Sequence, residues 1–163
     1  MNVMILLGSE SDFEVIEEAL KLLKEFRVPY RLEVTSAHRS PERTLRLVKE
    51  AEAGGAEVFI AVAGKAAHLA GIVAAQTVRP VIGVPVESAA LAGLDALLST
   101  VQMPKGVPVA TVALGKHGGA NAALLAIEIL ALKNEELRKK LIEHRAKMAA
   151  GVEASSKKIQ EKP

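Results

Sequence analysis

In this 163-residue sequence, His38 stands directly beside an arginine, in a setting that could combine proton transfer with anion binding. His38 precedes Arg39, and Ser36 lies two residues before the histidine. An imidazole exchanges protons near neutral pH, and a guanidinium can hold a phosphate through two parallel hydrogen bonds. The pair therefore indicates proton transfer next to a bound phosphate, whereas the same pair on an open surface would simply be solvated.

A glycine-led loop, Gly8-Ser9-Glu10-Ser11-Asp12, places hydroxyls and a carboxylate at the start of a predicted helix. Backbone amides and the helix dipole favour an anion such as phosphate at this position. Serine and aspartate are equally ordinary as helix caps, so a purely structural interpretation stays open. The sequence has neither G-x-G-x-x-G nor a P-loop G-K-[ST], which excludes the common dinucleotide and P-loop motifs.

A second histidine, His68, lies in a small-residue segment that spans residues 63–71 and includes Lys65. In such surroundings a histidine is more often structural than catalytic. The histidines are widely spaced, without H-E-x-x-H, and there is no cysteine, so neither a metal centre nor a thiol nucleophile is expected. No G-x-S-x-G motif indicates a serine hydrolase.

The elements that must position these loops are five short aliphatic runs alternating with helical patterns. The predicted strands are 3–7, 31–35, 58–62, 80–84 and 109–114. The predicted helices are 11–26, 41–53, 65–76, 89–99, 119–132 and a long charged helix from about 134. The predicted caps are a Ser11/Glu14 capping box, Ser40 before Pro41, Ser88 and Asn134.

Strict alternation of strands and helices predicts an α/β fold, a three-layer αβα sandwich around a five-stranded parallel sheet. Ligands of such sheets bind beyond the carboxyl ends of the strands. We therefore expect the three loops to meet at one edge of the sheet.

Length and composition favour one domain over residues 1–163 that assembles into an oligomer. A chain of this length buries roughly two-thirds of the surface that its unfolded form exposes, enough for one core. Half of the residues are hydrophobic and the mean hydropathy is +0.23, although no run is long enough to span a membrane. Apolar interfaces between subunits would account for this excess. An Ala-rich but ordinary monomer is the alternative.

The same numbers exclude several partners. The net charge is only +2, and basic residues are not interleaved with aromatic ones, so nucleic-acid binding is not expected. Apolar runs are interrupted well before 18 residues and no charged leader precedes a cleavage site. We therefore expect no membrane partner and a cytoplasmic location.

Read together, the loops resemble the N5-carboxyaminoimidazole ribonucleotide mutase family, the class I catalytic subunits of phosphoribosylaminoimidazole carboxylase. The resemblance extends from residue 3 to about residue 132. It rests on the segments Gly8-Ser9-x-Ser11-Asp12, Ser36-Ala37-His38-Arg39-x-Pro41, Ala66-Ala67-His68-Leu69, Gly83-Val84-Pro85-Val86, Val101-Gln102-Met103-Pro104-x-Gly106-Val107-Pro108-Val109 and Asn121-Ala122-Ala123-Leu124-Leu125-Ala126.

The resemblance implies a flavodoxin-like fold and a homo-octamer with its sites near subunit junctions, with the long helix from about 134 packing on neighbouring subunits. It implies interconversion of N5-carboxyaminoimidazole ribonucleotide and 4-carboxy-5-aminoimidazole ribonucleotide in purine (IMP) biosynthesis, without cofactor or metal. His38 would be the general acid and base, and Arg39 would bind the phosphate. The other residues expected to contact substrate are Ser9, Ser11, Asp12, Ser36, Gly64, Lys65, Ala66, His68 and Leu69, with Ala67 beside them in the carboxyl pocket.

One position departs from the family pattern. Where this chain has Lys65, the mutase class usually has glycine, and the related direct carboxylases tend to have a basic residue. Direct carboxylation of 5-aminoimidazole ribonucleotide by free carbon dioxide is therefore the first alternative, and a non-catalytic nucleotide-binding module is the second. His117, in a predicted loop at 116–119, is expected to be solvent-exposed.

Overall fold

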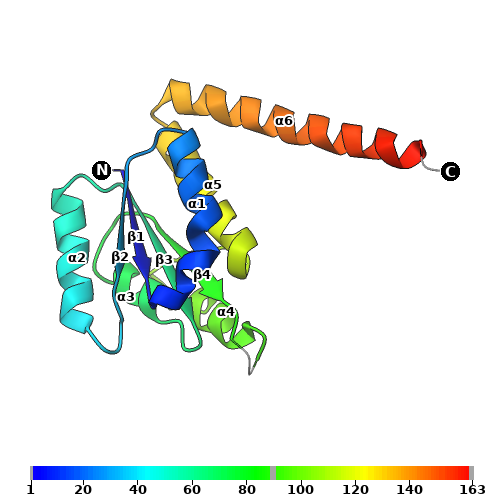
Figure 1. Cartoon of the computed structure of the whole chain (residues 1–163). Coiled ribbons are helices and arrows are strands. Elements are labelled where there is room, and N and C mark those ends of the chain that lie inside the picture. Colours follow the sequence, from blue (N-terminus) through cyan, green and yellow to red (C-terminus); the bar gives the residue numbers. More distant parts are fainter. Residues whose placement is uncertain (1, 89–90, 162–163) are drawn as a thin grey trace.

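The computed structural model describes residues 2–88 and 91–161, and its centre is a five-stranded parallel sheet (Figure 1). The strands are β1 (Val3–Leu7), β2 (Tyr30–Val34), β3 (Val58–Gly64), β4 (Val81–Val86) and β5 (Ala110–Thr111). Their order across the sheet is β2-β1-β3-β4-β5. This order is that of flavodoxin-like folds, in which the chain changes direction across the sheet between β1 and β3. The predicted αβα sandwich is confirmed.

Helices cover both faces of the sheet because its central strands are apolar on both sides. In β1, Val3, Ile5 and Leu7 join one buried cluster, while Met4 and Leu6 join the other. The first cluster is completed by α1 (Phe13–Glu25) and α5 (Gly115–Ala131), and the second by α2 (Pro41–Ala53) and α3 (Leu69–Ala74). The short α4 (Leu94–Val101) packs beside β4 and β5. Successive side chains of a strand point to opposite faces of the sheet, so β1 contributes residues to both clusters.

The last helix, α6 (Glu135–Gln160), leaves the rest of the molecule as a projecting arm (Figure 1). Asn134 caps it as predicted, accepting hydrogen bonds from the backbone N–H groups of Glu136 and Leu137 at 3.1 Å each. Leu137 and Leu141 are buried, but nearly every residue beyond Leu141 is exposed. Only the first two turns of this helix therefore pack on the sheet layers.

Several predicted boundaries and caps are wrong for local reasons. A 3-10 turn, Glu10–Asp12, precedes α1, so Ser11 is inside that turn and Asp12, without a side-chain cap bond, stands at the helix start. Ser40 precedes Pro41 as predicted, but its hydroxyl bonds to Ser36 instead of capping the helix.

Other differences lie after β3 and β4. The helix predicted at 65–76 is only Leu69–Ala74, because Lys65 has a left-handed backbone that cannot continue a helix. Gly93, with φ 84°, begins α4, whereas Ser88 donates a hydrogen bond to the Asp95 carboxylate. Residues 89–90 of the predicted helix 89–99 lie outside the described residues.

Helix α5 begins at Gly115, four residues earlier than predicted, because two glycines allow it to press against its neighbours. A Cβ on Gly118 would overlap the carbonyl oxygen of Ala113, and one on Gly119 would overlap that of Val15 in α1. His117 is therefore in a helix and not in a loop, although it is exposed as expected.

Candidate functional site

A cavity of about 680 Å³ lies at the carboxyl edge of the sheet, where β1, β2, β3 and β4 end. All the residues predicted for the site except Ala67 line it, so one cavity brings together loops that are far apart in sequence. Its described lining residues are Gly8, Ser9, Ser11, Asp12, Ser36, Ala37, His38, Arg39, Ala63, Gly64, Lys65, Ala66, His68, Leu69, Val86, Glu87 and Ser88. Ala67, expected beside the carboxyl pocket, is instead buried below the surface.

The centre of the cavity is a contact between two imidazoles. His38 Nε2 and His68 Nδ1 are 2.8 Å apart, and the rings meet edge to face with centroids separated by 4.9 Å. The two residues follow different strands, β2 and β3, and are 30 positions apart in sequence. A hydrogen bond between two imidazoles needs an N–H group on one ring and a lone pair on the other, so at this contact one ring is the donor and the other is the acceptor. Such a pair can both deliver a proton and take one back.

Hydroxyl groups hold the His38 loop in place from beneath. Thr35 and Thr44 are buried, and their hydroxyl oxygens lie 2.9 Å apart. The backbone N–H of Ser36 donates to the Ser40 hydroxyl at 3.1 Å, and the N–H of Arg39 donates to the Ser36 hydroxyl at 3.1 Å. These bonds satisfy backbone groups that would otherwise be unpaired in a tight turn. They position the imidazole and the guanidinium on the same side of the loop as the cavity.

The β1 loop contributes hydroxyls and a buried carboxyl group. The Ser9 hydroxyl accepts hydrogen bonds from the backbone N–H and the hydroxyl of Ser11, at 3.3 and 2.9 Å. Asp12 is only 7% exposed. Burial raises the pKa of its carboxyl group above the usual value, and this effect exceeds the lowering effects of Ser9 and Ser11. A buried carboxyl group has little access to water, so it is suited to form a hydrogen bond with a ligand in the cavity.

The β3 loop brings an apolar wall and a cation. Gly64 packs so closely on β4 that a Cβ there would lie 3.3 Å from the Val86 carbonyl oxygen. Lys65, the next residue, has φ 56°, and its side chain is exposed in the cavity. Leu69 is buried at the start of α3 and forms part of the cavity floor.

Strand β4 also contributes to the cavity, which was not predicted from the sequence. Val86, Glu87 and Ser88 line it, and Glu87 adds a second carboxylate to the lining besides Asp12. The rule that ligands lie at the carboxyl ends of parallel strands could have found them, because they directly follow the fourth strand. His117, by contrast, is not among the residues that line the cavity.

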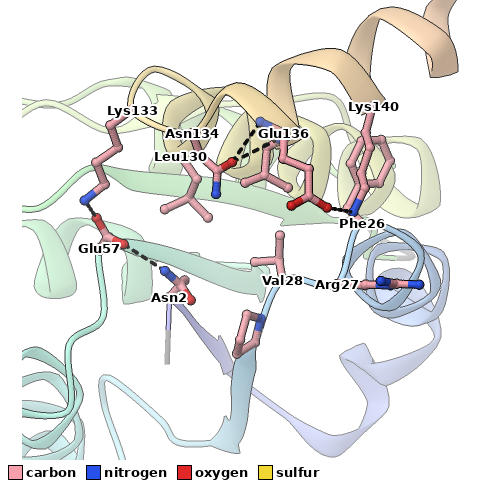
Figure 2. A pocket seen from close by; sticks show the side chains of 12 residues that line it. Asn2, Phe26, Arg27, Val28, Glu57, Leu130, Lys133, Asn134, Glu136 and Lys140 are labelled. Atoms are coloured by element: carbon pink, nitrogen blue, oxygen red, sulfur yellow. Dashed lines mark hydrogen bonds and ion pairs between the residues drawn. The ribbon is translucent and has the colours of Figure 1, made fainter.

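A second cavity, of about 420 Å³, lies at the opposite edge of the sheet beneath the junction of α5 and α6 (Figure 2). Four of its charged side chains form two ion pairs: Lys133 with Glu57, and Lys140 with Glu136 at 2.8 Å. Glu57 also accepts a hydrogen bond from Asn2, and its pKa is lowered chiefly by Lys133. No imidazole is among its described lining residues. These contacts tie α6 to the sheet and indicate a structural role.

The described residues form neither a candidate metal centre nor a membrane-spanning helix. Within 2–88 and 91–161, no group of three or more His, Asp or Glu side chains is placed to hold a metal ion. None of the described helices combines the length and the apolar character that crossing a membrane requires.

Fold and site together define a doubly wound α/β protein of flavodoxin-like topology, with its main cavity at the topological switch point and an imidazole pair at the centre. Residues 2–151 match the sequence model of the family described as AIR carboxylase. The chain belongs to this AIR carboxylase family.

Named relatives cover nearly the whole chain. The N5-carboxyaminoimidazole ribonucleotide mutase of Methanocaldococcus jannaschii is 55% identical over 98% of this chain and 98% of that protein. The Escherichia coli K12 protein of the same name is 51% identical over 86% of this chain and 83% of that protein. Among solved structures, Treponema denticola PurE aligns with a TM-score of 0.88 at 31% identity, covering 98% of each chain.

Proposed function

We propose that this protein interconverts N5-carboxyaminoimidazole ribonucleotide and 4-carboxy-5-aminoimidazole ribonucleotide in purine biosynthesis, acting as a mutase. One observation carries the proposal above all: the His38–His68 contact of 2.8 Å in the main cavity, beside Arg39. The names of relatives at 51% and 55% identity support the same reaction.

The reaction needs one group that first donates a proton to the substrate and later accepts a proton from it. The N5-carboxylate is a carbamate, and a proton from His38 turns its nitrogen into a leaving group. The C–N bond then breaks with its electron pair returning to nitrogen, which releases carbon dioxide and the 5-amino group. C4 of the electron-rich imidazole attacks the retained carbon dioxide, and His38 takes the proton from C4. Because one proton is spent and one is recovered, the reaction needs no net acid or base.

His68 suits this cycle because it is the hydrogen-bond partner of His38. Its hydrogen bond orients the His38 ring and lets the two imidazoles exchange a proton as charge changes on the substrate. The apolar surroundings formed by Gly64, Ala66 and Leu69 would retain neutral carbon dioxide and exclude water.

The remaining lining residues divide by chemistry into those for phosphate and those for ribose. Arg39, at a helix start beside the hydroxyl of Ser36, is suited to the phosphate. Ser9, Ser11 and Asp12 offer hydroxyl and carboxyl groups that match ribose hydroxyls.

Direct carboxylation with free carbon dioxide remains the second candidate, because Lys65 adds a cation to the cavity at a position where the mutase class usually has glycine. The two reactions differ only in the source of the carboxyl group. Purified protein should turn over N5-carboxyaminoimidazole ribonucleotide at low bicarbonate, measured by formation of the C4-carboxylated product. Turnover of 5-aminoimidazole ribonucleotide with bicarbonate, and none of the N5-carboxylated compound, would decide for the carboxylase instead.

The proposal includes a quaternary structure. We infer that residues 1–163 form one domain, that eight copies assemble, and that α6 packs on neighbouring subunits. Exposed apolar side chains support this assembly, on α4 and just before it (Leu91, Leu94, Leu98 and Val101) and along α6 (Ile142, Met148, Val152 and Ile159). A cytoplasmic location belongs to the same proposal, since a phosphorylated nucleotide does not cross a membrane unaided.

A further inference from the structure

Lys65 occupies a backbone conformation that a side chain makes unfavourable. Its φ of 56° lies in the left-handed region, where glycine is the usual residue because a Cβ crowds the neighbouring carbonyl oxygen. Only Arg27 and Ala92 share this property among the described non-glycine residues. A lysine at such a position points to a use for the side chain, because backbone strain concentrates at functional sites.

The main cavity has Lys65 among its lining residues, and the ammonium group of this lysine has no carboxylate partner among the described residues. Lys65 lines the same cavity as the two imidazoles, and it is exposed. The cavity's other lysine or arginine is Arg39, which follows β2, whereas Lys65 follows β3. The two cationic residues of the cavity, Arg39 and Lys65, therefore lie in loops after different strands.

The substrate under the proposed function carries two separate anionic groups, a phosphate and a carboxylate. Arg39 with its planar fork matches the phosphate. The second cation stands three residues before His68, in the loop that also supplies the apolar wall around the reacting carbon. Its charge is thus available on the side of the cavity where the carboxyl group changes position.

We propose that the Lys65 ammonium group binds the migrating carboxylate of the substrate and so sets the preference for carboxylated over uncarboxylated ribonucleotide. This inference rests on the proposed function. The contact is made with the N5-carboxylate and again with the C4-carboxylate, but it is lost while the group is neutral carbon dioxide. It therefore stabilises both ends of the reaction and not its middle, and its removal raises KM without lowering kcat.

The test replaces Lys65 in three ways. Lys65→Gly removes both charge and strain, Lys65→Met removes the charge and keeps the strain, and Lys65→Arg keeps both. We expect Lys65→Gly and Lys65→Met to raise KM for the N5-carboxylated substrate about tenfold, the scale of one charge-assisted hydrogen bond. Lys65→Arg should restore most of the affinity, and kcat should not fall in any variant.

A matched control separates strain from charge. Arg27 has nearly the same backbone angle, φ 58°, but lies at the opposite edge of the sheet beside the second cavity. Arg27→Gly and Lys65→Gly should each raise Tm by about 2 °C, because both relieve a left-handed side chain. Only Lys65→Gly should change KM.

Equilibrium binding keeps this inference distinct from the proposed reaction. Calorimetric titration with 4-carboxy-5-aminoimidazole ribonucleotide and with 5-aminoimidazole ribonucleotide should show that Lys65→Gly weakens only the carboxylated ligand. That result supports the Lys65 contact even if wild-type protein catalyses no interconversion. Equal weakening of both ligands, unchanged affinity for both, or a wild-type protein that binds neither would overturn it.

Discussion

His38 lies between a hydroxyl-bonded loop and a second imidazole, and this setting separates the catalytic role proposed for its ring from the contacts that stabilise its loop. Its loop is stabilised by Thr35, Ser36, Ser40 and Thr44, none of which depends on the imidazole itself. Replacing the ring should therefore remove chemistry without unfolding the loop.

We expect His38→Asn to lower kcat by about a hundredfold to ten-thousandfold, the usual cost of losing a general acid and base, with ribonucleotide binding largely retained. Steady-state kinetics and calorimetric binding of 5-aminoimidazole ribonucleotide measure the two effects. Arg39→Ala is the control with the opposite pattern, since it should weaken binding of the phosphorylated ligand. An unchanged kcat in His38→Asn would contradict the role of His38 as general acid and base.

Asp12 shows the cost of placing a carboxyl group in the cavity. Burial raises the pKa of Asp12, so the folded state disfavours the ionised carboxylate. The contribution of Asp12 to the free energy of unfolding is therefore most favourable at low pH, where the carboxyl group is protonated. This contribution is lost as the pH rises through the raised pKa.

Asp12→Asn should raise the free energy of unfolding at pH 7 by about 1 kcal/mol, the usual scale of one substitution at a buried position. The difference from wild type should vanish below about pH 4, where the aspartate is protonated as well. Urea unfolding at several pH values measures this. The same variant should bind ribonucleotide more weakly, and a variant that is less stable yet binds normally would contradict this role for Asp12.

At the scale of elements, the contact between α1 and α5 depends on glycine. Gly119 is buried against the Val15 carbonyl group, and Gly118 against that of Ala113. A side chain at Gly119 would push α5 away from α1, and one at Gly118 would push the start of α5 away from the loop that follows β5.

Gly119→Ala should therefore destabilise the fold by at least about 2 kcal/mol, because the new methyl group meets backbone that cannot move aside. Gly151→Ala is the matched control: Gly151 lies within α6, and a Cβ there would meet nothing within 4 Å. It should raise helix stability by about 0.5–1 kcal/mol. Thermal unfolding of both variants tests the contrast, and two equal changes would refute the packing argument.

The shape of the whole molecule favours assembly with further copies of the chain. More than half of α6 projects beyond the sheet layers, and its apolar side chains there are uncovered, with Val152 71% exposed and Ile159 68% exposed (Figure 1). A second copy of the chain would bury such a stripe at the scale of a stable interface.

We expect sedimentation velocity at micromolar concentration to give one octameric species. Val152→Asp should shift it toward smaller species, since an unpaired charge in an apolar interface is costly. Ala154→Asp, on another side of the same exposed helix, should have a smaller effect. A wild-type monomer would contradict the proposed assembly, and unchanged assembly of Val152→Asp would remove α6 from it.

Local patterns in the sequence were sufficient for most of the fold. The first strand, 3–7, and the helix 41–53 are predicted with their observed bounds, and the Asn134 cap is confirmed. Strand hydrophobicity, proline at a helix start and an asparagine cap act within a few residues, so sequence reasoning can find them. The strand-end rule likewise predicted that the three loops would meet in one place, and all the residues predicted for the site except Ala67 line one cavity.

Only the tertiary structure decided the relations between distant residues. The His38–His68 contact joins positions 30 residues apart, and Glu87 enters the cavity because β4 lies beside β3. The position of α5 also depends on a neighbour in space, since Gly119 meets the Val15 carbonyl group of α1, which no local pattern contains. The sequence by itself thus determined which residues could do the chemistry, and packing across the sheet decided which of them touch.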